Sequence, residues 1–253
     1  MGIKVLGCDE VRKAYFLAGF DREVEPMRII SMGKCNYNCS YCKRGGQFRD
    51  CSGNIISSKN IDITDIFEII DLAISRGQKI RLSGGDPCCY PKESRLIAKY
   101  CYEKHGQLIS IAHNGSSPTF VNSIVEYLDY AAIDLKGCTN MEIAKTASIP
   151  VSNYIERIID IIKICQLHNV LVDIRTVVFP DSNISDLIKI GELLKKYSNV
   201  FWTLRKFVDD NTNTSSTNFD IVEVCDIIKN NHSTLRVGCR DKWTGTNFYI
   251  PIR

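Results

Sequence analysis

The stretch Cys35–Cys42, Cys-Asn-Tyr-Asn-Cys-Ser-Tyr-Cys, carries the residue types and spacing that point most directly to chemistry. Its three cysteines, Cys35, Cys39 and Cys42, would converge on one point if the backbone formed a compact loop. Thiolates are soft ligands that select iron–sulfur clusters, zinc or copper(I). A [4Fe–4S] cluster normally takes four cysteines, so three would leave one iron open to another ligand, as in an open zinc site. The alternatives are a zinc site completed by a distant Cys or His, and three unrelated buried thiols.

A second motif, Ser83-Gly84-Gly85-Asp86-Pro87, follows a short apolar segment. Alone it would be a good turn. Together the two motifs resemble the radical S-adenosylmethionine (radical SAM) enzymes. Their hallmark is Cys-x3-Cys-x2-Cys with an aromatic residue before the third cysteine, here Tyr41. These enzymes also carry a Gly-Gly-Glu-Pro-like segment at the end of the next strand, and Asp86 stands in place of that Glu.

The resemblance implies a [4Fe–4S] cluster on Cys35, Cys39 and Cys42, with S-adenosylmethionine chelated at the open iron. An electron donor such as flavodoxin or ferredoxin would then drive cleavage to methionine and a 5′-deoxyadenosyl radical. The backbone at Ser83, Gly84, Gly85 and Asp86 would bind the methionine ammonium, which requires residues without a Cβ in the way.

Two further segments, His113-Asn114-Gly115 and Asp134-Leu135-Lys136, resemble the activating enzymes of glycyl radical proteins, including those for pyruvate formate-lyase and anaerobic ribonucleotide reductase. The resemblance implies that Asn114, Asp134 and Lys136 contact the cofactor. Ala112 replaces an acidic residue that helps to bind a monovalent cation in one such activator, which puts that cation site in doubt. His113 either faces the substrate or makes a structural hydrogen bond.

Arg175 lies in a β-branched apolar segment, Asp173–Val178. A buried arginine needs a partner, so we expect either a ligand carboxylate or Asp173, which shares its face of the strand. The resemblance implies the cofactor carboxylate. The alternative is an arginine that faces outward.

The remaining cysteines of the twelve suggest less chemistry. Cys88 and Cys89 are interpreted as small packing residues, with a redox pair or hydrogen-atom donor as the alternative. Cys51, in a loop-like segment, is assigned no role. We expect four to be small core residues: Cys8, Cys101, Cys165 and Cys225.

Strand-like and helix-like segments alternate along the chain, which predicts parallel βαβ units. We expect strands near 27–32, 79–83, 108–113, 130–135, 170–178 and 200–204, with a last strand at 234–237. We expect helices near 64–74, 92–105, 120–128, 155–165, 184–197 and 219–230, with Thr64 and Thr119 as caps. The fold class is therefore α/β, a partial (β/α)6 TIM-type barrel as in the radical SAM core. Its motifs lie at the C-terminal ends of strands, where barrel enzymes place their chemistry.

The length of 253 residues predicts a single domain, 1–253. It would comprise an N-terminal lead-in (1–25), irregular or short helical over residues 8–25, the core (26–207) and a C-terminal helix, strand and tail (208–253). A net charge of +3 and the lack of a basic run do not argue for nucleic acid. No apolar stretch reaches eighteen residues, so we expect no membrane span and a cytoplasmic location.

These observations predict a radical SAM oxidoreductase that abstracts a hydrogen atom. The leading substrate is a glycine of a partner glycyl radical enzyme, and the alternative is a small molecule. A wide mouth facing a partner protein would favour the first. A mouth plugged by the 43–60 loop and the tail would favour the second. A zinc-binding interaction module is the alternative from another class.

Overall fold

Six strand–helix units and a closing strand form the body of the computed structural model, which describes residues 2–8, 11–13, 26–39, 41–42, 59–207, 220–240 and 248–249. Seven strands are parallel and neighbour one another in chain order. They are β3 (Pro26–Met32), β5 (Lys79–Gly84), β6 (Ile109–His113), β7 (Leu128–Asp134), β8 (Leu171–Val178), β9 (Val200–Lys206) and β10 (Val237–Arg240). The predicted partial barrel of parallel βαβ units is confirmed.

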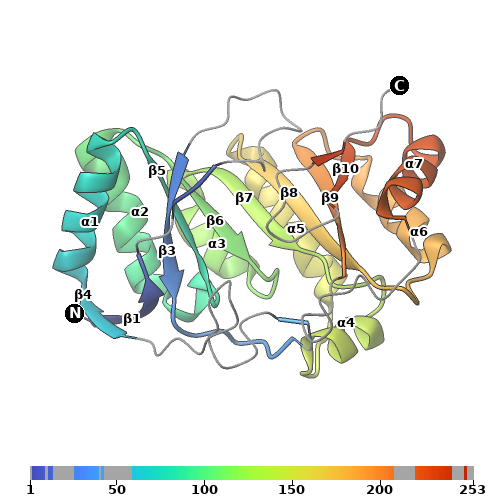
Figure 1. Ribbon diagram of the computed structural model, residues 1–253, viewed down its shortest axis with the longest axis horizontal. Coiled ribbons are helices and arrows are strands. Elements are labelled where there is room, and N and C mark those ends of the chain that lie inside the picture. Colours follow the sequence, from blue (N-terminus) through green and yellow to red (C-terminus); the bar gives the residue numbers. More distant parts are fainter. Residues whose placement is uncertain are drawn as a thin grey trace.

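The helices that connect these strands pack on one face of the sheet. They are α1 (Ile63–Ser75), α2 (Pro91–His105), α3 (Pro118–Ile124), α4 (Asn140–Ala147), α5 (Tyr154–Leu167), α6 (Ile184–Leu194) and α7 (Ile221–Asn231). Figure 1 shows α1 and α2 at one end of the sheet and α6 and α7 at the other. No helix in the described part of the chain is both long and apolar enough to cross a membrane.

The two faces of the sheet differ in chemistry because side chains alternate along each strand. The outward residues, such as Leu82, Ile111 and Ile174, join the helices in one large apolar core. The inward residues form only a small separate apolar group around Met27, Tyr130 and Ala132. Much of the inner face is instead polar and charged, which is unusual for a barrel packed only for stability.

Antiparallel strands extend the sheet at both edges. β1 (Gly2–Gly7) lies between β3 and β4 (Lys59–Asp62), while β2 (Val11–Lys13) pairs with β3 and β11 (Phe248–Tyr249) pairs with β10. The prediction of an irregular or helical lead-in is wrong at β2. It failed because short edge strands depend on partners far away in the chain rather than on local pattern.

Several boundaries differ from the prediction because capping residues were misassigned. Asp62, not Thr64, is the N-cap of α1. Ser117, not Thr119, caps α3 by accepting a hydrogen bond from the Phe120 N–H, with Pro118 in the first turn. That helix ends at Ile124, and a 3-10 turn, Val125–Tyr127, leads into β7. The last parallel strand begins at Val237 rather than Thr234, and helix α4 was not foreseen.

Some predictions concern residues outside the described ranges. These are Cys51, most of the 43–60 loop, the polar tract 209–218 and most of the tail after Arg240. The division of 1–253 into lead-in, core and tail stays a prediction.

Candidate functional site

The cysteine loop begins where β3 ends, at the C-terminal edge of the parallel strands. Cys35 and Cys42 are exposed and Cys39 is half-buried. The Gly33 N–H donates to the Lys4 carbonyl oxygen of β1, and the Cys42 N–H donates to the Cys39 carbonyl oxygen in a turn. The loop is thereby tied to the sheet while its thiols stay accessible to a ligand.

Two donors are directed at the Cys35 sulfur, and a buried cation acts on the Cys39 thiol. Asn114, just past β6, places its Nδ2 3.8 Å from the Cys35 Sγ. The Tyr37 backbone N–H also donates to that sulfur, at 3.4 Å. The positive charge of Lys136, just past β7, acts on the Cys39 thiol and lowers its pKa against the effect of burial. N–H donors stabilise thiolate ligands of iron–sulfur clusters.

Lys136 is a buried cation held between two oxygen atoms. Its Nζ lies 3.0 Å from Asp134 Oδ2 and 2.9 Å from Tyr41 Oη. Burial acts to lower the pKa of Lys136, but the Asp134 carboxylate outweighs it and the pKa lies well above its usual range. Three predicted cofactor contacts, Tyr41, Asp134 and Lys136, therefore meet in one hydrogen-bonded group beside Cys39.

The two glycines of the second motif allow β5 to end against the cysteine loop. Gly84 has a φ of +97°, and a Cβ on Gly85 would lie 2.1 Å from the Lys34 carbonyl oxygen. The Gly85 N–H donates to the Met32 carbonyl and the Asp86 N–H to the Lys34 carbonyl, both at 2.8 Å. Glycine is required here by contact between the two motifs, whatever ligand also binds.

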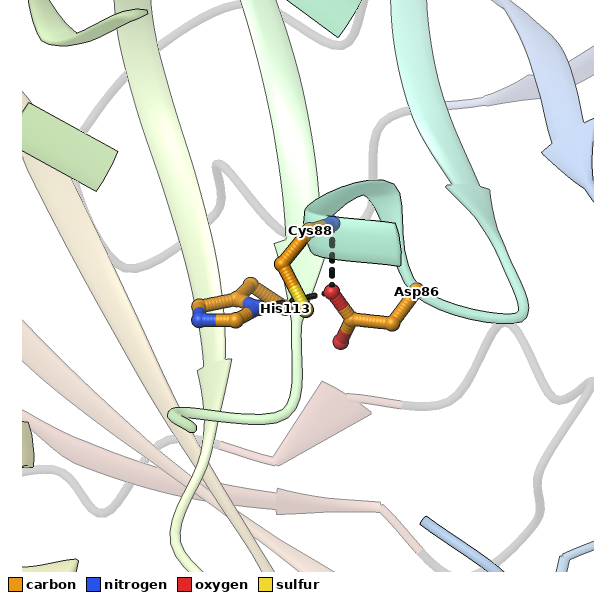
Figure 2. A group of neighbouring side chains, drawn as sticks. All are labelled: Asp86, Cys88 and His113. Atoms are coloured by element: carbon orange, nitrogen blue, oxygen red, sulfur yellow. Dashed lines mark hydrogen bonds and ion pairs between the residues drawn. The ribbon is translucent and has the colours of Figure 1, made fainter. Parts of the chain in front are cut away.

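Figure 2 shows how the Asp86 carboxylate lies among its neighbours. Its Oδ1 accepts hydrogen bonds from the Cys88 N–H (2.9 Å) and from His113 Nδ1 (2.8 Å). Its Oδ2 accepts from the Asn114 N–H at 2.7 Å. Burial acts to raise the pKa of Asp86, but His113 and the Cys88 N–H lower it. The side chain therefore fastens the end of β5 to the end of β6, next to Asn114.

Ligand atoms of Asp86, Cys88 and His113 lie within 4.8 Å of one another, a spacing that would suit a metal ion. However, His113 Nε2 accepts a hydrogen bond from the Ser117 N–H at 3.1 Å. Its proton is therefore on Nδ1, which donates to Asp86, so both ring nitrogens are in use. Asp86, Cys88 and His113 therefore form a hydrogen-bonded structural bracket between the ends of β5 and β6. Of the two roles predicted for His113, the structure shows the structural hydrogen bond.

Arg175 is buried on the inner face of β8, so the outward-facing alternative is wrong. Its Nε lies 2.6 Å from Asp173 Oδ2. Asp173 also accepts hydrogen bonds from Tyr130 Oη (2.9 Å) and Thr203 Oγ1 (2.5 Å). Asp173 is therefore the observed partner, and the contact to a cofactor carboxylate stays a prediction.

The cysteines outside the loop are mostly buried in the apolar core or packed against it. The prediction that Cys8, Cys101, Cys165 and Cys225 are core residues is confirmed. Cys88 packs partly against the core, and its Sγ lies 3.6 Å from Ser116 Oγ. The packing role of Cys88 and Cys89 stays a prediction.

Sequence reasoning missed Tyr154, the first residue of α5. Its buried hydroxyl donates to the Asn114 carbonyl oxygen at 2.7 Å and lies against the Asp134 carbonyl oxygen. It joins two strand ends that carry predicted cofactor contacts. No local spacing marks it, because both partners are distant in the chain.

The residues present fit an iron–sulfur cluster. Although Cys35 is exposed as a whole residue, the atoms packed around its sulfur partly remove the thiol from water, and this desolvation and then the Asp86 charge raise the pKa of the thiol to about 12. Without metal this cysteine is therefore protonated, and a cluster would displace the proton as it binds. The accessible thiols, the donor from Asn114 and the positive charge of Lys136 all favour thiolate ligation.

Comparison with known proteins agrees with this arrangement. The pattern of the Radical SAM superfamily matches residues 29–194. A Methanocaldococcus jannaschii protein that bears the name of a glycyl-radical enzyme activating enzyme is 27% identical over 183 residues, covering 68% of this chain and 71% of its own. A GTP 3′,8-cyclase of Clostridium perfringens is 25% identical over 247 residues, covering 92% of this chain and 71% of its own.

Solved structures show the same fold. SuiB of Streptococcus suis bound to S-adenosylmethionine superposes with a TM-score of 0.64 at 13% identity, over 83% of this chain and 49% of SuiB. TYW1 with a lysine-pyruvate adduct superposes with a TM-score of 0.57 at 16% identity, over 90% of this chain and 78% of TYW1. The chain thus spans about half the length of SuiB. Because the superfamily pattern matches most of its parallel sheet, the chain belongs to the radical SAM superfamily, whose members use a [4Fe–4S] cluster and S-adenosylmethionine.

Proposed function

We propose that this protein is a radical SAM oxidoreductase that cleaves S-adenosylmethionine reductively and abstracts a hydrogen atom from its substrate. Cys35, Cys39 and Cys42 would hold the cluster. Bound together, the cluster and S-adenosylmethionine supply a 5′-deoxyadenosyl radical and methionine, at the expense of one electron from a donor such as flavodoxin or ferredoxin. Transfer of a substrate hydrogen atom to that radical gives 5′-deoxyadenosine and leaves the unpaired electron on the substrate.

The observation that carries this proposal is the convergence of two strand-end donors on the cysteine loop. Asn114 reaches the Cys35 sulfur, and Lys136 reaches the Tyr41 hydroxyl, between Cys39 and Cys42 in the loop. In our proposal these donors orient the thiolates and hold positive charge next to them. The glycine turn at Gly84 and Gly85 would bring its backbone to the methionine end of the cofactor.

The test is reductive cleavage under anaerobic conditions. Wild type reduced with dithionite is expected to form 5′-deoxyadenosine, while Cys35→Ala, Cys39→Ala and Cys42→Ala form none. Cys225→Ala, which changes a thiol in the core, serves as the matched control and should retain cleavage. Cleavage that survives in all three loop variants would contradict the proposal.

The substrate has two candidates. A glycine of a partner glycyl radical enzyme is supported by the similarity to the M. jannaschii protein. A small molecule is supported by the similarity to GTP 3′,8-cyclases. Both the 43–60 loop and the tail that would distinguish an open mouth from a plugged one lie largely outside the described residues.

A further inference from the structure

The Tyr37 side chain, in the middle of the cysteine loop, carries a buried hydroxyl that the bonds of the site do not explain. Tyr37 is only 8% exposed, and its Oη has no hydrogen-bond partner among the described residues. A buried hydroxyl without a partner costs free energy, and native proteins pair most such groups. Phenylalanine would fill the same space without this cost, so we expect the hydroxyl to serve a group that binds here.

The loop holds Tyr37 between two of the proposed cluster ligands. It is two residues from Cys35 and two from Cys39. Its own backbone N–H donates to the Cys35 Sγ at 3.4 Å. On its other side, the Asn38 N–H donates to the Ala147 carbonyl oxygen at the end of α4. The backbone of Tyr37 is therefore fixed on both sides in the segment that would surround the cluster.

The surroundings of the hydroxyl belong to the same site. The Tyr37 ring lies beside that of Tyr154, with ring centres 6.5 Å apart. Burial raises the pKa of Tyr37 to about 12, while among the smaller effects the Lys136 charge lowers it and the Cys39 thiol raises it. The hydroxyl therefore keeps its proton at neutral pH and lies within electrostatic reach of Lys136 and Cys39.

Given the cluster of the proposed function, we propose that the Tyr37 hydroxyl donates a hydrogen bond to one of the sulfur atoms of that cluster. A phenolic O–H is a donor, and hydrogen bonds to the sulfurs help to set the reduction potential of an iron–sulfur cluster. An added electron increases the negative charge on the sulfurs, so the hydrogen bond is stronger in the reduced state. Tyr37 would thus make the cluster easier to reduce.

A redox titration of Tyr37→Phe tests this without measuring activity. Wild type and variant are reconstituted anaerobically, and the reduced cluster is followed by electron paramagnetic resonance without S-adenosylmethionine. The variant should bind as much iron as wild type. Its midpoint potential should be more negative, with an equilibrium constant for reduction about threefold smaller or less. Tyr102→Phe, at an exposed position on α2, is the matched control and should titrate like wild type.

The metal-free chain gives a second, independent measurement. There the Tyr37 hydroxyl has no partner to lose, so Tyr37→Phe should melt at the temperature of wild type or above it. Tyr154→Phe removes a hydroxyl that already donates to the Asn114 carbonyl oxygen, so it should melt at a lower temperature. The contrast between the two tyrosines separates a hydroxyl that serves a bound group from one that stabilises the fold.

Two results would overturn the inference. They are a midpoint potential of Tyr37→Phe equal to that of wild type, and a metal-free Tyr37→Phe that melts below wild type. An unchanged potential with a raised requirement for S-adenosylmethionine would assign the hydroxyl to the cofactor instead. Iron content and 5′-deoxyadenosine formation of wild type, measured separately, report on the proposed function. A cluster that is present but insensitive to Tyr37 would therefore refute this inference alone.

Discussion

At the scale of single residues, Asp86 stands out because one carboxylate joins the two strand ends nearest the cluster loop. It accepts three hydrogen bonds, from Cys88, His113 and Asn114. The family residue at this position is Glu. The shorter Asp86 accepts its hydrogen bonds from two backbone N–H groups and the His113 imidazole. It therefore influences the site by fixing the position of Asn114.

Asp86→Asn should lower the free energy of unfolding of the metal-free chain by ~2–3 kcal/mol near pH 7, because the new amide places a donor against groups that already donate. Asp65→Asn, at an exposed position in the first turn of α1, should change it by less than about 0.5 kcal/mol. Denaturant unfolding followed by circular dichroism measures both.

The same pair of proteins tests the lowered pKa of Asp86. A carboxyl whose pKa is lower in the folded state stabilises above its ordinary pKa of about 3.9, and that stabilisation is lost in acid. The stability difference between wild type and Asp86→Asn should therefore be constant at neutral pH and shrink below about pH 4. A difference that stays constant into acid would show that the ionised carboxylate is not what stabilises the bracket.

Arg175 is the other residue whose role is open to direct test. Arg175→Gln should raise the S-adenosylmethionine concentration needed for half-maximal cleavage about tenfold, since a charge-assisted contact is lost. Iron content should be unchanged, because Arg175 bonds to Asp173 and, in the described part of the chain, is not hydrogen-bonded to any of the three loop cysteines. Arg175→Lys, which keeps the charge, should recover part of the loss. If half-saturation is the same in wild type and Arg175→Gln, Arg175 does not bind the cofactor.

At the scale of elements, the end of β5 and the cysteine loop after β3 act as one unit. Their backbones approach too closely for any side chain at Gly85. Two backbone hydrogen bonds, to the Met32 and Lys34 carbonyl oxygens, hold them together. The second motif therefore shapes the first, which explains why both are needed on adjacent strands.

Gly85→Ala should separate the two loops and reduce the iron bound after anaerobic reconstitution to well under half of wild type. The free energy of unfolding should fall by ~2–4 kcal/mol, as for other severe steric changes. Gly7→Ala is the control, because a Cβ there meets nothing within 4 Å. Full iron content in Gly85→Ala would show that the loop folds without the contact.

The elements also show what could be predicted from sequence. Strands such as β8 were predicted correctly because β-branched residues predominate in them. β1, β2 and β4 did not, since their pairing joins segments far apart in the chain. The cysteines and strand-end residues were found by motif, whereas the bonds of Asp86, Tyr154 and Asp173 depend on tertiary contacts.

At the scale of the whole molecule, the two faces of the sheet and the C-terminal ends of its strands carry different kinds of residue. The outer face of the sheet packs against the helices, its C-terminal ends carry the cysteine loop, and its inner face carries buried polar and charged residues such as Arg175. In the proposed enzyme the cluster would lie at the C-terminal ends of the strands, next to the polar inner face of the sheet.

The central claim is that three cysteines leave one iron open for S-adenosylmethionine. Electron paramagnetic resonance of the dithionite-reduced, anaerobically reconstituted enzyme tests it most directly, with spectra recorded before and after a saturating addition of S-adenosylmethionine. The cluster signal of wild type should change shape when the cofactor binds the open iron, and Cys225→Ala should behave identically. A reduced cluster with the same spectrum in both states, or a chain that holds zinc and no iron, would contradict it.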